Sequence, residues 1–81
     1  MTYTITEIAN INRAELNKLI PLWSKYYKIN VTDINLKQNI VQIKKNNHAV
    51  YYYLCTGSYY DYSKFTGGKI EINKIHTLFK I

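Results

Sequence analysis

The sequence is poor in cysteine, proline and glycine, and each shortage excludes a class of protein. Its single cysteine, Cys55, excludes an internal disulfide, and one proline with three glycines excludes a collagen-like or low-complexity chain. No apolar run approaches the ~20 residues that span a bilayer, and the first residues lack the basic start and apolar stretch of a signal peptide. We therefore expect a cytoplasmic protein without a membrane segment, in which Cys55 is a buried, reduced thiol.

Residues that carry catalysis or bind metals are also scarce. The only two histidines, His48 and His76, have no cysteine pair near them, which does not fit a zinc site. Cys55 has no evident base beside it. The five acidic residues are unpaired in the sequence; Glu15 is assigned to a helix cap and the others to the surface: Glu7, Asp33, Asp61 and Glu71. We expect no metal, no cofactor and no enzymatic activity.

The composition is that of one small folded domain covering residues 1–81. The chain is 47% hydrophobic and 15% aromatic, outside the range in which chains stay disordered. Its net charge of +6 favours encounter with acidic proteins or nucleic acid, although the same charge also serves solubility. The lysines are dispersed rather than gathered in a basic arm. Abundant Ile, Asn, Lys and Tyr are also typical of an AT-rich genome.

Six of the nine tyrosines fall between Tyr51 and Tyr62. A buried tyrosine must bury its ring and still give its hydroxyl a hydrogen-bond partner. A core of this size cannot absorb that many, so several of these rings should face outward as a recognition surface.

The first third of the chain predicts a strand followed by a helix. Residues 2–8 alternate and are rich in β-branched types, which indicates a strand. Asn12 then offers an N-cap, with Glu15 three residues on completing a capping box. The helix after it keeps five apolar residues on one face, with Trp23 as a core anchor: Leu16, Leu19, Ile20, Trp23 and Tyr27. Pro21 predicts a kink near Asn17–Pro21.

Residues 32–45 are compatible with two structures. Thr32 or Asp33 can cap a helix whose apolar residues Leu36, Ile40 and Ile43 recur at helical spacing, and we favour this helix. Residues 40–43 also fit a strand. Asn46–Asn47 predicts a turn in either case.

From His48 onward the period changes to two, which predicts a sheet. Val50, Tyr52 and Leu54 should face the core from a central strand, and Gly57–Ser58 should form a hairpin turn. A partner strand is expected over residues 59–65, with Tyr60 and Tyr62 on one face and a turn at residues 66–68. In the last strand the apolar residues switch parity, which predicts a β-bulge near Asn73–Lys74 or the end of one strand and the start of another.

The predicted fold class is therefore α+β, in the order β-α-α-β-β-β, with a mainly antiparallel sheet and helices packed on it. Segments 15–27, 47–54 and 69–79 resemble the first helix, second strand and bulged fourth strand of the GNAT acetyltransferase superfamily. That family binds acetyl-CoA through a glycine-rich segment after the fourth strand. No such segment is present among these residues, so the resemblance implies the N-terminal half-fold without the activity, and no catalytic or cofactor residue is carried over.

Three functions follow, in order of preference. The first is a small non-catalytic binding protein of the kind with which mobile genetic elements inhibit host machinery, such as an anti-CRISPR inhibitor, acting on a host protein or nucleoprotein complex. The second is a nucleic-acid-binding protein that stacks tyrosines on bases. The third is a degenerate acetyltransferase. An exposed sheet edge could also be covered by a second copy, giving a homodimer. The partner-binding candidates are Tyr51, Tyr53, Tyr60, Tyr62, Lys44, Lys45 and Lys64.

Overall fold

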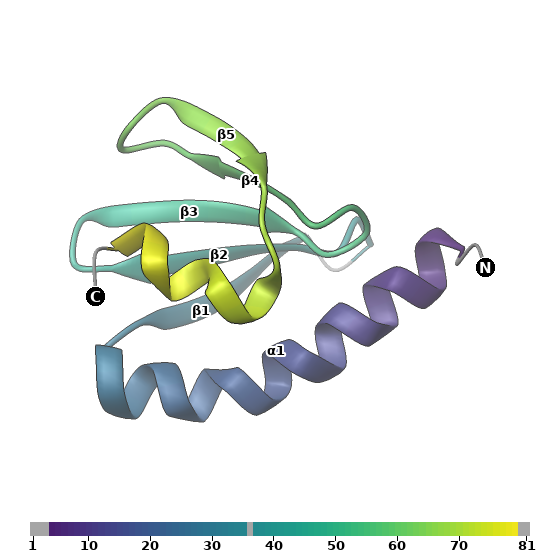
Figure 1. Cartoon of the computed structure of the whole chain (residues 1–81), viewed down its shortest axis with the longest axis horizontal. Helices are drawn as coiled ribbons and strands as arrows, with labels where there is room; N and C mark the ends of the chain where they lie inside the picture. Colours follow the sequence, from purple (N-terminus) through teal and green to yellow (C-terminus); the bar gives the residue numbers. More distant parts are fainter. Residues whose placement is uncertain (1–3, 36, 80–81) are drawn as a thin grey trace.

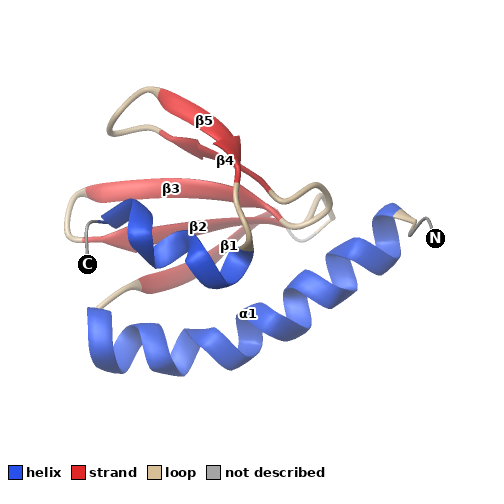
Figure 2. Cartoon of the chain, viewed as in Figure 1, coloured by secondary structure: helices blue, strands red, loops and turns tan. Residues whose placement is uncertain are grey.

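A computed structural model, which describes residues 4–35 and 37–79, has two helical elements on one side of a five-stranded antiparallel sheet (Figures 1 and 2). The strands lie in sequence order across the sheet, β1-β2-β3-β4-β5. The elements are α1 (Ile5–Tyr27), β1 (Asn30–Asn35), β2 (Ile40–Lys45), β3 (His48–Tyr53), β4 (Ser58–Asp61), β5 (Thr66–Lys69) and the 3₁₀-helix η1 (Ile72–Phe79). The α+β class is confirmed, whereas the predicted order β-α-α-β-β-β is wrong.

The first element of the described part is α1 and not a strand. Thr4 is the N-cap, its hydroxyl accepting from the Glu7 backbone N–H while the Glu7 carboxylate accepts from Thr4, a complete capping box. This signal outweighs the alternation that predicted a strand over residues 2–8, of which residues 2 and 3 lie outside the described part. Asn12 is therefore inside the helix, and its amide donates to the Leu54 carbonyl at 2.7 Å rather than capping.

The second half of α1 packs as its spacing predicts. Leu16 and Trp23 are buried, with Leu19, Ile20 and Tyr27 packed against the same core. The helix runs unbroken through Pro21, and its axis bends along its length in Figure 1, which is one way that a helix accommodates an internal proline. It ends at Tyr27, and the C-cap residue Lys28 has a left-handed φ of 57° and donates its N–H to the Trp23 carbonyl.

The predicted helix over residues 32–45 is wrong: this region is the β1–β2 hairpin. Asn39 has a φ of 56°, and the Asn35 side chain accepts from the Gln38 N–H, so asparagines shape the turn. Leu36, one of the residues on which the helix rested, lies outside the described part. The pairing with β3 decides the outcome, because Val41 and Ile43 then reach the core on the period of a strand.

The predictions for β3 are confirmed. It is the central strand, Val50 and Tyr52 are buried along with Leu54 just beyond it, and Asn46 turns the chain into it with a φ of 55°. Gly57, with a φ of 72°, forms the turn before β4. β4 ends at Asp61, so residues 62–65 form a connection and not the end of a strand.

The C-terminal segment differs most from its prediction. Residues 66–68 belong to β5 and not to a turn, and residues 72–79 form η1 and not a bulged strand. The change of parity near Asn73–Lys74, from which we predicted a bulge, has a helical origin. Ile72, Ile75 and Phe79 are separated by three and four residues, and all three are buried. The segment compared with the bulged fourth strand of acetyltransferases is thus not a strand through most of its length.

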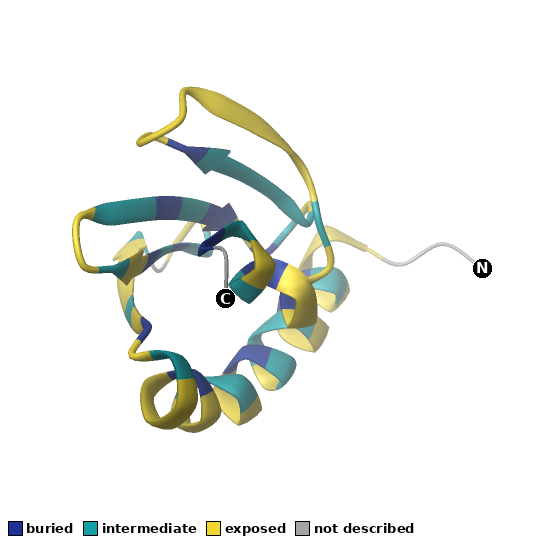
Figure 3. Ribbon diagram, turned by 60° about the vertical axis from the view of Figure 1, so that its left-hand side comes forward, coloured by how far each residue is buried: buried dark blue, intermediate teal, exposed yellow. Residues whose placement is uncertain are grey.

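The core lies between the sheet and both helices (Figure 3). Cys55 is only partly buried, which corrects the expectation of a buried thiol, and the Asn39 amide lies 3.7 Å from its sulfur. Among the described residues, twelve hydrophobic side chains form the core: Ala9, Leu16, Trp23, Ile29, Val41, Ile43, Val50, Tyr52, Leu54, Ile72, Ile75 and Phe79.

Candidate functional site

Of the tyrosines that the structure describes, four lie on the face of the sheet opposite the helices, and we call this surface the tyrosine face: Tyr51, Tyr53, Tyr60 and Tyr62. Because Val50 and Tyr52 of β3 point into the core, Tyr51 and Tyr53 point the other way. The register places Tyr60 of β4 directly opposite Tyr51. All four tyrosines that the sequence proposed for partner binding are therefore brought together.

The rings of the tyrosine face pack against one another. Tyr62 lies edge-on to Tyr51 and to Tyr60, with centroid separations of 4.7 and 4.6 Å. Tyr62 is 48% exposed and Tyr53 36%, so these two rings offer the most free surface. The Tyr60 ring also lies across β5, where the Cδ1 atom would be 3.1 Å from a Cβ atom at Gly67. A glycine is needed there for the close approach.

The Tyr62 hydroxyl is affected by its position on this face. The pKa of Tyr62 is raised above its usual range, first by desolvation and then by the electrostatic effect of Tyr53, Tyr51 and Tyr60. The Tyr62 hydroxyl is therefore neutral at physiological pH and can both donate and accept hydrogen bonds.

The charge around the tyrosine face has one sign. Lys44 pairs with Ala49, so its side chain belongs to this face, and it is exposed. Of the residues that the structure describes, no Asp or Glu points to this side. The carboxylates lie on the helical side: Glu7 and Glu15 in α1, Asp33 bonded to Arg13 of α1 at 2.7 Å, Asp61 in the covered face, and Glu71 beside Ile8 and Asn12.

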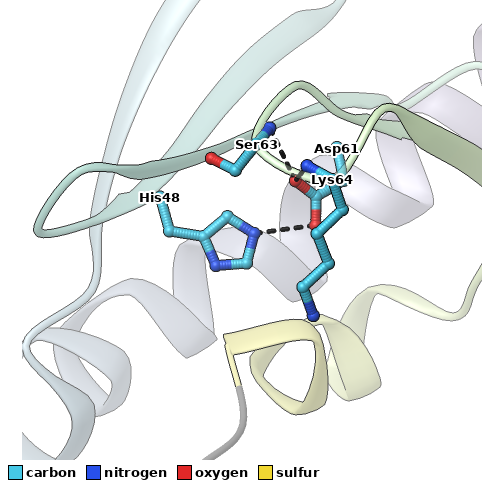
Figure 4. Close-up of polar contacts among 4 residues, drawn as sticks. All are labelled: His48, Asp61, Ser63 and Lys64. Carbon is cyan, nitrogen blue, oxygen red and sulfur yellow. Dashed lines mark hydrogen bonds and ion pairs between the residues drawn. The ribbon is translucent and has the colours of Figure 1, made fainter.

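The other two candidate lysines do not lie on this face. Lys45 has the opposite parity and lines a surface hollow of about 450 Å³ together with His48, Ser63 and Phe79. Lys64 lies in the connection between β4 and β5, and Figure 4 shows its side chain on the side of Asp61 and His48. Both lysines are thus close to the β4–β5 turn, which we define as residues 62–65.

A buried carboxylate that the sequence analysis assigned to the surface organises this turn. Asp61 is only 1% exposed. Its Oδ1 accepts from the backbone N–H groups of Ser63 and Lys64 at 3.0 and 3.1 Å, and its Oδ2 lies 2.7 Å from His48 Nε2 (Figure 4). The sequence carried a local signal for part of this role, because aspartate often accepts from the backbone N–H two residues on in an Asx-turn, as Asp61 does from Ser63.

The His48–Asp61 pair joins two strands of the sheet, because His48 begins β3 and Asp61 ends β4. His48 also packs on Phe79, with centroids 4.7 Å apart. Within the described ranges, no nucleophile is hydrogen-bonded to its other ring nitrogen, and no three His, Cys, Asp or Glu side chains converge as metal ligands. The pair fixes the β4–β5 turn to the β3 strand.

None of the helices in the described part combines the length and the apolar character needed to cross a bilayer. Comparison with protein-family models, with curated proteins and with solved structures finds no match to this chain. The functional argument therefore depends on the geometry of the tyrosine face and of the turn beside it.

Proposed function

We propose that this is a small non-catalytic binding protein whose tyrosine face contacts an anionic region of a host protein or nucleoprotein complex. An inhibitor carried by a mobile genetic element, acting on host machinery in the manner of an anti-CRISPR protein, is the role that we propose. The observation that carries the proposal is the gathering of four tyrosines and Lys44 on one face, with no Asp or Glu side chain of the described residues on that side.

Two physical arguments support this proposal. Tyrosine supplies a large, rigid contact area that also forms hydrogen bonds, and it is among the residues that dominate binding energy at interfaces. The helices leave this face of the sheet uncovered, and the concentration of tyrosines on it adds no buried packing to the core. A partner with a negative surface would complement Lys44 and the net charge of +6.

An affinity pull-down from host-cell lysate, with and without nuclease, tests the proposal. The wild-type protein should capture a stoichiometric partner that survives nuclease treatment. Tyr53→Ala should weaken its capture, whereas Tyr26→Ala should not, because Tyr26 is an exposed tyrosine on α1, 64% accessible and away from the tyrosine face. Equal loss with both variants, or capture that nuclease abolishes, would contradict a protein interface at this face.

A charge reversal gives a second matched pair. Lys44→Glu should weaken capture through repulsion of an anionic partner, while Lys18→Glu, at an exposed position of α1, should leave it unchanged. Size-exclusion chromatography of each variant reports whether the protein forms a dimer. The edge strands that a second copy could cover are β1 and β5.

Single-stranded nucleic acid is the second candidate partner, favoured by the same absence of carboxylates beside exposed aromatic rings. Stacking of a base on Tyr53 or Tyr62 would contribute about 1–3 kcal/mol. Fluorescence anisotropy with a labelled oligonucleotide measures this directly: affinity should fall steeply with salt, and Lys44→Glu should reduce the slope. Affinity that stays flat between low and moderate salt would exclude this mode.

A further inference from the structure

The β4–β5 turn presents a phenylalanine in an unfavourable way. Phe65 is 81% exposed, more than any other large hydrophobic residue in the described part of the chain. Its backbone φ is 52°, a left-handed conformation in which bulky side chains are rare and Gly, Asn or Asp is favoured. A phenyl group at this position therefore contributes little buried surface to the fold and does not suit the backbone conformation.

The turn that contains Phe65 is held in place by side-chain hydrogen bonds. The Asp61 carboxylate takes the N–H groups of Ser63 and Lys64 and the ring nitrogen of His48, so its buried charge is matched by three polar contacts. Four residues connect β4 to β5, and Phe65 is the last of them. Strain that the surrounding structure maintains is characteristic of functional positions.

Two lysines lie in or next to the turn that carries Phe65. Lys64 precedes Phe65 in the sequence, and Lys45 lines a hollow that Ser63 of the same turn also lines. Asp61, the nearest carboxylate in the sequence, is buried and occupied by its three contacts. A partner that fits the turn should therefore offer an apolar pocket for the phenyl ring and negative charge around its rim.

We infer that Phe65 is the anchor of the proposed interface and inserts into an apolar pocket, rimmed by carboxylates, on the protein partner. This inference rests on the proposed function, because Tyr62, at the other end of the turn, packs on Tyr51 and Tyr60 of the tyrosine face. A shaped protein surface can contact both. A bilayer is a poor alternative, since one phenyl buries less apolar surface than a myristoyl chain, which alone binds membranes only marginally.

Phe65→Asn separates this role from folding. Asparagine tolerates the left-handed backbone and removes the phenyl without leaving a cavity, so the Tm should equal or exceed that of the wild type. Affinity for the partner, once purified after the lysate pull-down and titrated by calorimetry, should fall about 30-fold or more, as expected for a hot-spot residue. Phe65→Leu should keep part of the affinity, and Tyr26→Ala should keep all of it.

A photo-crosslinker gives an independent measurement. Benzoylphenylalanine at position 65 should crosslink to that same protein, while the same group at position 26 should not. Wild-type affinity in Phe65→Asn would overturn the inference and leave the proposed function intact if Tyr53→Ala still weakens capture.

Failure of the wild type to capture any nuclease-resistant protein would overturn both. Binding to a labelled 20-nucleotide oligo(dT), or to vesicles containing anionic phosphatidylglycerol, that is lost in Phe65→Asn would assign the turn to nucleic acid or membrane instead and overturn the protein pocket.

Discussion

The two faces of the sheet use the same residue type for opposite purposes. Tyr52 is 1% exposed, lies in the core, and donates its hydroxyl to the Ile70 carbonyl at 2.9 Å. Tyr53, the next residue in the chain, is on the tyrosine face with its ring partly free. The side of the pleat, and not the residue type, decides whether a tyrosine stabilises the fold or is available to a partner.

The largest effect should come from the covered side. Trp23→Ala removes a fully buried ring from the centre of the core, and we expect it to lower the free energy of unfolding by about 3–5 kcal/mol. Tyr26→Ala, three residues along the same helix but exposed, should change it by less than about 0.5 kcal/mol. Urea denaturation followed by circular dichroism measures both, and similar midpoints would refute the assignment of the core.

Asp61 tests whether a polar group on the covered side matters as much as an apolar one. Asp61→Asn leaves one oxygen to accept from the N–H groups of Ser63 and Lys64 but places an NH2 group opposite His48 Nε2, which must then accept a hydrogen bond instead of donating one, so we expect a loss of about 1–3 kcal/mol. Asp33→Asn is the matched control, since its pair with Arg13 is partly exposed and should contribute less than about 1 kcal/mol. Equal losses would show that Asp61 is not the organising group.

Substitution of two neighbouring glycines of β5 compares the space available on the two faces at the edge of the sheet. A Cβ at Gly67 would lie 2.9 Å from the Tyr59 carbonyl oxygen, so Gly67→Ala should force the strand to shift, at a cost of about 1–3 kcal/mol. At Gly68 the nearest atom would be 3.6 Å away, an ordinary contact, so Gly68→Ala should be neutral or slightly stabilising. Thermal melts of the two variants should therefore diverge, and coincident melts would argue against the close approach at Gly67.

The smallest effect concerns one hydroxyl. Tyr52→Phe should cost about 0.5–1.5 kcal/mol at neutral pH through the lost hydrogen bond to Ile70. Burial, followed by the charge of Glu71, raises the pKa of Tyr52 to about 12. Because the unfolded hydroxyl ionises near pH 10, its contribution is complete below that pH and is lost as the pH rises toward 12.

The measurement is the difference in unfolding free energy between wild type and Tyr52→Phe at a series of alkaline pH values. This difference should shrink above pH 10, because Tyr52 is present only in the wild type, while the other ionisable groups are common to both proteins. A constant difference would mean that Tyr52 is not desolvated in the folded state.

Local patterns determined several parts of this protein. The alternation from His48 to Leu54 predicted a central strand with Tyr52 inside and Tyr51 and Tyr53 outside, because the pleat has a fixed period of two. The spacing of Leu16 and Trp23 predicted the buried face of α1 for the same kind of reason. Most of the tyrosine face was accessible from the sequence, because Tyr51, Tyr53 and Tyr60 are placed by parity within two adjacent strands, whereas Tyr62 lies just beyond the end of β4.

Only the tertiary structure decided the secondary structure of segments whose apolar residues fit both a helical and a strand period. Ile40 and Ile43 suit a helix as well as a strand, and pairing of β2 with β3 selected the strand. The parity switch in residues 70–79 suited a bulge until η1 packed Ile72, Ile75 and Phe79 against the core. The burial of Asp61 and the exposure of Phe65 likewise arise from the closure of β4 on β5 and on His48, contacts between separate elements that no local period encodes.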